Sequence, residues 1–402
     1  MSLDDQSAMM STFPPAVGAQ VTLGNWRSPP FNRWAFHHVR EIIPTAEIGI
    51  DRMRVRDIPA GDGASIPSAL SVAGNDTCSL TDVLRESHTD AMLILRRGAI
   101  EFEYYAGGTD RYSPHILMSV SKSILGLVGG VLSDKGLIDP QNRLTDYIPE
   151  LAHTAYRSAR LQHLLDMRVG IGFEEDYELT EGPIIDYRKA TNWNPPGPGE
   201  TPTDLRQFFT TLTETDGEHG GRFHYMSTNT DLLAWVFERA TGMRYADLVA
   251  QHLWQPLGAE TPAYITVDRL GAPRAAGGVC VTARDLARVG QLFVGGGVCQ
   301  GDRVISNAWI DDLAASADAN AWTEGDFAPL LPGYGLRYRN KWYVLDDDGV
   351  TLFGIGIHGQ HLFVDRAREL VVVKFSSLPT AFAGADVARN IEIYLALRRA
   401  IA

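Results

Sequence analysis

The most informative segment of the chain, His115–Gly130, reads HILMSVSKSILGLVGG. Its apolar residues predict a helix over about 118–135, which Gly136 would end. Ser119 and Lys122 are three residues apart, close to one helical turn, so their side chains share one face of that helix. The segment therefore predicts a hydroxyl and an amine side by side near a helix N-terminus.

This pair suits nucleophilic catalysis. A serine hydroxyl needs a base to lose its proton at neutral pH, and a lysine amine can act as that base once burial has lowered its pKa. The backbone N–H of Ser119, at the start of the helix, would stabilise an oxyanion. The alternative is a chance S-x-x-K in which Lys122 extends into solvent. We expect Ser119 to be the nucleophile and Lys122 its general base.

A second candidate segment, Gly221–Thr230, reads GRFHYMSTNT and precedes an apolar helix. A tyrosine at the head of a helix that faces a Ser–Lys pair can pass a proton to a leaving group, which is the role expected for Tyr225. Ser227 follows two residues later. The alternative is a buried aromatic at 225 and a serine N-cap at 227.

The third segment, Phe353–Gln360, reads FGIGIHGQ. Glycines at alternate positions of a strand allow a substrate backbone to come close, and the N–H of Ile357 would then be a second oxyanion donor. A glycine-bearing bend is the alternative. On a strand, His358 and His361 would point to opposite faces, and the chain has no H-E-x-x-H, P-loop or dinucleotide motif. We expect neither a metal nor an organic cofactor.

The composition is that of a globular enzyme, with 45% hydrophobic and 21% charged residues and a net charge of -13. This acidity argues against nucleic acid as a partner and is compatible with a small-molecule substrate. There is no apolar run long enough for a membrane span, the N-terminus does not read as a secretory signal, and three cysteines form no C-x-x-C pair. We expect a cytoplasmic protein without a membrane partner, and leave a homodimer open.

The order of the elements predicts the fold class. A strand pair over Ala91–Tyr105 and four strands near the C-terminus enclose a helical middle. We expect an α/β (α+β) fold with an antiparallel sheet flanked by helices, an inserted helical lobe, and the active site between the lobes. The expected boundaries are an irregular arm at 1–75, an α/β lobe at 76–135 and 265–402, and a mostly helical lobe at 136–264. Further expected elements are helices at 203–213, 228–241, 245–254, 283–294 and 383–399, strands at 341–344, 351–357, 360–365 and 369–375, and loops at 174–188 and 194–202.

Several long segments resemble one known family, the 6-aminohexanoate-dimer hydrolases within the serine β-lactamase and penicillin-recognising superfamily. The segments are HILMSVSKS (115–123), NRLTDYIPELA (142–152), TNTDLLAWVFERATG (228–242), GGVCVTARDLARVG (277–290) and GIGIHGQ (354–360). The resemblance implies a serine β-lactamase-like fold and hydrolysis of short linear amides or esters. It also implies a nucleophile–base pair at Ser119 and Lys122, proton transfer by Tyr225, and an oxyanion hole from the N–H groups of Ser119 and Ile357. The substrate-binding residues that it implies are Tyr177, Asp186, Ser227, Tyr343 and His358.

The chain departs from that family at positions that bear on the substrate. Gly354–Gly356 stands where β-lactamases carry K-T-G, so the usual lysine anchor for a β-lactam carboxylate is missing. Arg188 occupies the position of an acidic residue that meets the substrate amine in the oligomer hydrolases, and Ala276 that of a polar residue. The alternatives are therefore a β-lactamase or D-alanyl-D-alanine peptidase, and an inactive binding protein of the same fold.

Overall fold

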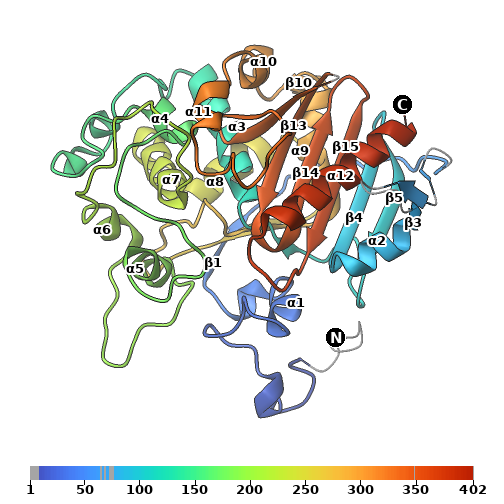
Figure 1. Cartoon of the computed structure of the whole chain (residues 1–402), viewed down its shortest axis with the longest axis horizontal. Coiled ribbons are helices and arrows are strands. Elements are labelled where there is room, and N and C mark those ends of the chain that lie inside the picture. Colours follow the sequence, from blue (N-terminus) through green and yellow to red (C-terminus); the bar gives the residue numbers. More distant parts are fainter. Residues whose placement is uncertain (1–8, 64–65, 68, 72–76, 348, 402) are drawn as a thin grey trace.

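The centre of the computed structural model is an antiparallel sheet with the strand order β11-β12-β13-β14-β15-β4-β5. The structure describes residues 9–63, 66–67, 69–71, 77–347 and 349–401 (Figure 1). The strands of this sheet are β4 (Thr89–Arg96), β5 (Ala99–Tyr105), β11 (Leu336–Arg339), β12 (Trp342–Asp347), β13 (Gly349–Gly356), β14 (Gln360–Asp365) and β15 (Leu370–Ser376). Because β15 pairs with β4, strands from the two ends of the chain close the sheet, as expected.

Helices cover both faces of this sheet (Figure 1). Strand β4 shows why, since alternate side chains point to opposite faces: Leu93 and Leu95 belong to the apolar cluster that contains helix α9, and Met92 and Ile94 to the cluster that contains α12. The helices are α9 (Ala283–Val294) on one side and α12 (Gly384–Ile401) with α2 (Leu80–Glu86) on the other. A sheet buried on both faces is a rigid platform for the segments that leave its edges.

The half of the molecule that lies beside the sheet is helical, and it is drawn in green and yellow in Figure 1. Its elements are α4 (Leu161–Leu165), α5 (Pro183–Ala190), α6 (Leu205–Phe209), α7 (Ser227–Thr241) and α8 (Tyr245–Val249), which continues into a π-helical turn at Ala250–Trp254. Helix α3 (Val120–Asp134) is buried between the two halves, against both β13 and α7. The domain boundaries given above stay a prediction.

The N-terminal arm was expected to be irregular, and this is wrong for part of it. It forms helix α1 (Phe31–Ala35) and strand β1 (Thr45–Ile48), while residues 1–8 and 72–76 lie outside the described part of the chain. β1 joins a second sheet with the order β1-β7-β8-β6, whose other strands are β7 (Ala263–Thr266), β8 (Val279–Val281) and β6 (His115–Ile116). The arm is thus integrated into the fold by backbone pairing.

The remaining elements are small. They are α10 (Asn307–Ala315), α11 (Ala319–Thr323), the pairs β2–β3 (Ala69–Ser71, Thr77–Ser79) and β9–β10 (Val298–Cys299, Asp302–Arg303), and short 3₁₀ turns at Val17–Ala19, Val39–Glu41, Leu144–Asp146, Pro149–Leu151 and Ile357–Gly359. Within the described residues, no helix combines the length and the apolar character needed to cross a lipid bilayer.

Most expected elements are confirmed, and three are wrong in extent or kind. The chain turns between β4 and β5 at Arg97 and Gly98, both of which have positive φ, as expected. Helices α3 and α7 are followed by Gly136 and Gly242, which also have positive φ. The helix expected at 203–213 is only Leu205–Phe209, because Asp204 caps it and its last turn is not helical. The loop expected at 174–188 ends in helix α5, and His358 lies in a turn rather than on a strand.

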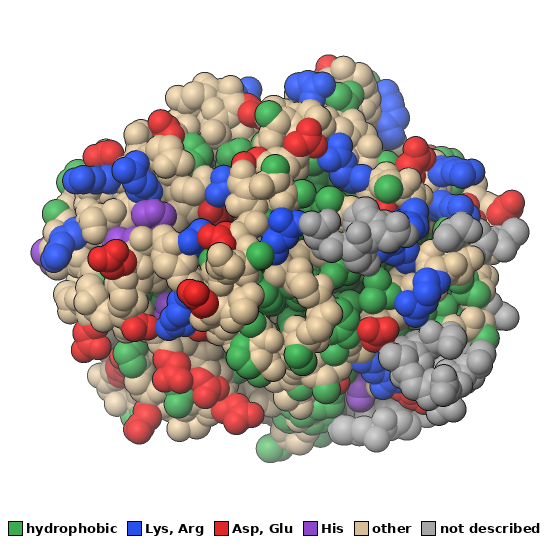
Figure 2. Space-filling model, turned by 45° about the horizontal axis from the view of Figure 1, so that its top comes forward, with side chains coloured by type: hydrophobic (Ala, Val, Ile, Leu, Met, Phe, Trp, Pro, Cys, Tyr) green, Lys and Arg blue, Asp and Glu red, His purple; other side chains and the backbone are tan. Residues whose placement is uncertain are grey.

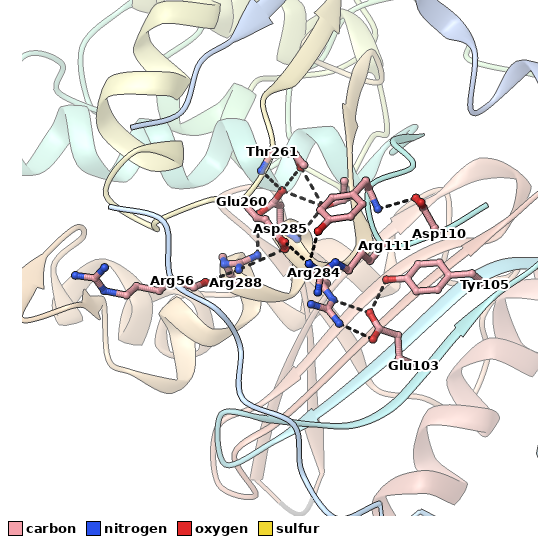
Figure 3. A network of polar contacts seen from close by, with 12 residues as sticks. Arg56, Glu103, Tyr105, Asp110, Arg111, Glu260, Thr261, Arg284, Asp285 and Arg288 are labelled. Atoms are coloured by element: carbon pink, nitrogen blue, oxygen red, sulfur yellow. Dashed lines mark hydrogen bonds and ion pairs between the residues drawn. The ribbon is translucent and has the colours of Figure 1, made fainter. Parts of the chain in front are cut away.

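A network of arginines and carboxylates ties the arm and the main sheet to helix α9 (Figure 3). Arg284 of α9 donates to both carboxylate oxygens of Glu103 on β5, each at 2.7 Å. Arg288 donates to Asp285 at 2.8 Å and to the backbone carbonyl of Arg56 in the arm at 2.6 Å. Asp285 in turn accepts the backbone N–H of Glu260 at 2.7 Å. We call this set the α9 arginine network.

Candidate active site

The predicted nucleophile and base are in contact. Ser119 is the N-cap residue of α3, and the Nζ of Lys122, one turn along, lies 2.7 Å from the Ser119 Oγ. Lys122 is 2% exposed, and burial lowers the pKa of its amine to about 7. A large fraction of the amine is therefore neutral at physiological pH, as a base requires. The alternative in which Lys122 extends into solvent is wrong.

A buried chain of hydrogen bonds holds the Lys122 amine in place. Its second partner is the carbonyl oxygen of Ala276 at 2.9 Å. The N–H of that same residue donates to Asp231 Oδ1 at 2.7 Å, and Asp231 also accepts the hydroxyl of Tyr187 at 2.6 Å and an ion pair from Arg274. Because Ala276 acts here through its backbone, the polar side chain that the family carries at this position is not needed for this contact.

Tyr225 lies on the other side of the pair. Its hydroxyl is hydrogen-bonded to the Ser119 side chain, and the Lys122 Nζ is 4.8 Å from the centre of its ring. Burial raises the pKa of the Tyr225 phenol well above its usual value, so the hydroxyl keeps its proton near neutral pH and can donate it. Phe327 stacks on the ring with 4.7 Å between the centroids, which fixes its orientation.

The glycines of β13 meet the nucleophile helix itself. A Cβ at Gly356 would lie 2.6 Å from the carbonyl of Leu117 and 3.1 Å from the N of Ser119, and one at Gly354 would lie 2.9 Å from Ser123 Oγ. The expectation that these glycines make room for a substrate backbone is thus wrong in its reason, because helix α3 occupies that space. Their absence of side chains lets the strand bring Ile357 beside Ser119, and both residues line the same two pockets.

Glu175 is a site residue that the sequence did not single out. Its carboxylate accepts the Ser227 hydroxyl at 2.6 Å, the Ser227 backbone N–H, and the Tyr177 hydroxyl at 3.1 Å. Ser227 therefore binds Glu175 rather than capping α7, whose N-cap residue is Met226. Glu175 connects the loop before α5 to the first turn of α7. The only sequence signal for it is the acidic and aromatic segment EEDYE at 174–178, which does not distinguish Glu175 from its neighbours.

Ser119 lines two adjoining cavities, and a third lies beside them. An aromatic pocket is lined by Ser119, Tyr177, Tyr225, Phe327, Tyr343 and Phe382, among others. A narrow pocket beside it is lined by Arg27, Arg188, Arg274, Glu175, Trp193 and Ile357, among others, and we call it the arginine pocket. A groove of about 780 Å³ opens next to both and is lined by the carboxylates of Glu174, Glu175, Asp176, Glu178, Glu214, Asp216 and Asp326; we call it the acidic groove. Tyr177 lines all three cavities, and Tyr343 lines the aromatic one.

Two predicted substrate-binding residues lie apart from these cavities. Asp186 is exposed on α5, and Arg188 of the same helix points into the arginine pocket instead. His358 is 3% exposed; its Nδ1 contacts the carbonyl of Leu378 at 2.7 Å and its ring packs edge-on against Phe36. Burial lowers the pKa of His358 to about 4, so its imidazole is a neutral structural group.

One group of described side chains has the donor types of a metal site, namely His37, Asp90 and His115. Asp90 already accepts the Ser377 hydroxyl and contacts His115 Nε2 at 3.2 Å and the guanidinium of Arg33 at 3.3 Å. A cation already beside the only carboxylate of the group disfavours a metal ion there. The group instead joins α1 of the arm to β4 and β6.

The geometry thus assembles a serine, a buried lysine and a tyrosine at one point, and the comparison with known proteins agrees. The model of the β-lactamase family matches residues 80–396. The chain belongs to the β-lactamase family. A relative named 6-aminohexanoate-dimer hydrolase, from Paenarthrobacter ureafaciens, is 38% identical over 367 residues, which are 91% of this chain and 91% of the relative. The resemblance noted in the sequence is confirmed, and the chain is a serine hydrolase of amides or esters.

Solved structures of the β-lactamase fold bear out the architecture. A Bacillus anthracis protein assigned as a 6-aminohexanoate-dimer hydrolase superposes on this chain with a TM-score of 0.84 and 25% sequence identity. The superposition covers 96% of this chain and 98% of the Bacillus anthracis chain. EstCE1, a hydrolase with promiscuous acyltransferase activity, gives a TM-score of 0.60 at 18% identity, over 80% of this chain and 96% of its own. The expected serine β-lactamase-like fold is therefore confirmed.

Proposed function

We propose that this β-lactamase-family protein hydrolyses short linear amides or esters through an acyl-enzyme on Ser119. The single observation that carries the proposal is the 2.7 Å contact between the Ser119 Oγ and the buried Lys122 amine, whose pKa is lowered to about 7. The relative named as a 6-aminohexanoate-dimer hydrolase supports a linear amide as one substrate.

The proposed reaction starts with proton removal. Neutral Lys122 takes the Ser119 proton while the Oγ adds to the substrate carbonyl carbon. The N–H groups of Ser119 and Ile357 hold the resulting oxyanion. The proton on Lys122 then passes through the Tyr225 hydroxyl to the leaving amine or alcohol as its bond to carbon breaks. Water, deprotonated by Lys122, cleaves the acyl-enzyme, and Ser119 regains its proton.

A matched set of substrates tests this proposal. A fluorophosphonate should label Ser119 in the wild type and not in Ser119→Ala, and p-nitrophenyl esters should be hydrolysed far faster than nitrocefin. Absence of label and of ester turnover would leave the inactive binding protein as the better description. Nitrocefin turnover that exceeds ester turnover would favour a β-lactamase, a candidate weakened by Gly354–Gly356, which offers no lysine to a β-lactam carboxylate.

The proposal places the enzyme in a reducing compartment, the cytoplasm. Cys280 is buried and Cys299 partly buried, and both are free thiols in the described chain. Burial raises the pKa of Cys280, which makes the thiol less reactive. Free thiols of this kind are typical of cytoplasmic proteins.

A further inference from the structure

We propose that the arginine pocket binds a carboxylate on the acyl part of the substrate, so that the preferred substrates are half-amides or half-esters of short dicarboxylic acids. This inference rests on the proposed Ser119 chemistry and adds the substrate class. It follows from three observations: guanidinium groups without acidic partners, the balance of charge in the pocket, and the position of Tyr225 relative to the cavities.

Two of the pocket arginines pair with no carboxylate among the described residues. Arg188 is 7% exposed and makes only long contacts of 3.3–3.5 Å with the backbone carbonyls of Asp176, Tyr177 and Leu179. Arg27, from the N-terminal arm, donates to Asn194 Oδ1, and its guanidinium lies 5.8 Å from the centre of the Trp193 ring. Arg188 is buried and Arg27 is half-buried. A cation withdrawn from water without a counter-ion costs free energy, and a bound anion would reduce that cost.

The pocket has more positive than negative groups. Arg274 is paired with Asp231, which leaves Arg27 and Arg188 against one further carboxylate in the pocket lining, that of Glu175, whose oxygens accept hydrogen bonds from Ser227 and Tyr177. Asp176, near Arg188, is exposed to solvent. Burial, together with the positive charges of Arg188 and Arg274, lowers the pKa of Arg27 to about 9. At neutral pH all three guanidinium groups are charged, which suits a carboxylate and repels an ammonium group.

The position of Tyr225 indicates which part of the substrate enters the arginine pocket. Tyr225 lines the acidic groove and the aromatic pocket but is not among the residues that line the arginine pocket. If it protonates the leaving group, that group departs toward the acidic groove, and the acyl chain must extend the other way. An amine released from an amide becomes a cation, which suits a groove with many carboxylates. Figure 2 shows acidic side chains gathered at the lower left of the molecule, over its helical half.

The partners of the basic residues in the groove support this division. Arg222 is paired with Asp216 and Asp326, and His224 contacts Asp326 at 2.8 Å. Their charge is therefore compensated, and the remaining carboxylates keep the groove negative. A substrate with an anionic acyl end and an amine leaving group would match both sides of Ser119.

Three esters with six acyl carbons each test the inference: p-nitrophenyl hexanoate, mono-p-nitrophenyl adipate and p-nitrophenyl 6-aminohexanoate. Their acyl chains end in a methyl, a carboxylate and an ammonium group, respectively. We expect kcat/KM for the adipate ester to exceed that for the hexanoate ester about tenfold, which is the size of one charge-assisted hydrogen bond, and the ammonium ester to be the poorest. In Arg188→Gln the adipate-to-hexanoate ratio should fall toward one, and in Arg188→Glu the order of the charged esters should reverse.

The controls separate this inference from the Ser119 chemistry. Arg27→Gln provides a second variant should Arg188→Gln fail to fold, and Arg239→Gln, which removes an exposed ion pair with Glu150, should keep the wild-type ratio. Hydrolysis of the hexanoate ester without any preference for adipate, or a preference unchanged in both pocket variants, would overturn the carboxylate pocket and leave the hydrolase intact. Loss of all turnover and of Ser119 labelling in the wild type would overturn both.

Discussion

The arginines of the α9 network differ from Arg27 and Arg188 of the arginine pocket in the groups that they contact. In the network, Arg284 meets both oxygens of Glu103 and Arg288 meets Asp285, so each charge is compensated within the fold (Figure 3). In the pocket, Arg27 and Arg188 contact only neutral oxygens. The ion pairs of the first group stabilise the folded protein without a ligand, whereas the arginines of the second group would gain an anionic partner only when a substrate carboxylate binds. Similar side chains therefore serve structure in one place and recognition in the other.

The largest expected effect comes from removing the nucleophile or its base, which lie beside the arginine pocket. Ser119→Ala or Lys122→Met should lower kcat/KM for p-nitrophenyl esters by at least about a thousandfold, because the nucleophile or its base is lost. The melting temperature should stay close to that of the wild type, since the α9 network is untouched. Turnover in Lys122→Met comparable to the wild type would assign the base to another group.

The pH dependence of turnover should reflect the lowered pKa of the buried Lys122 amine. Because the pKa of Lys122 is lowered to about 7, the neutral fraction of its amine rises as the pH rises through that value. We expect kcat/KM for the uncharged hexanoate ester to increase about tenfold per pH unit below 7 and to level off above it. A flat profile between pH 5 and 8 would contradict a lysine base.

Glu175 should behave as a positioning residue. Glu175→Gln removes the charge that holds Ser227 and Tyr177 together, and we expect a loss of about tenfold in kcat/KM, mainly through KM, because the loop over the site is held less well. Glu181→Gln, an exposed change on the same loop, is the matched control and should have no effect. Equal losses in the two variants would point to a general effect of loop charge.

The smallest expected effects distinguish the two arginine groups by stability alone. Arg284→Gln should lower the free energy of unfolding by about 1–2 kcal/mol, because it leaves the partly buried Glu103 without its partner. Arg188→Gln should change that free energy by less than about 0.5 kcal/mol or raise it, since no carboxylate loses a partner. Urea unfolding of the two variants measures the difference, and equal losses would mean that the pocket arginines are structural as well.

Local signals in the sequence were sufficient for the elements that carry the chemistry. Helix α3, the β4–β5 hairpin and α7 end at glycines or tight turns whose conformations depend on a few neighbouring residues. The contact between Ser119 and Lys122 follows from helical spacing within one such element. Strand β1 was not predicted because its partner β7 lies more than two hundred residues along the chain, and no local pattern reports such pairing.

The remaining site residues depended on the tertiary fold. Several acidic residues follow one another at 174–178, and only the position of Ser227 on another element selects Glu175. The family resemblance placed Asp186 in the site, within a segment expected to be a loop, but the segment is helical. Helical periodicity then turns Ile184, Tyr187 and Arg188 inward and Asp186 to solvent. His358 was misplaced because the chain turns with a positive φ at that residue, which a strand pattern does not reveal.

The N-terminal arm has a practical consequence for anyone who prepares shortened forms of this enzyme. The family match begins at residue 80, yet Arg27 lines the cavity beside the nucleophile and Trp26 donates its ring N–H to the carbonyl of Trp193 in the wall of that cavity. A fragment cut at the family boundary would keep Ser119, Lys122 and Tyr225 but lose Arg27 from the arginine pocket and strand β1 from the second sheet. Screening such fragments for substrates would therefore report the selectivity of a different, more open enzyme.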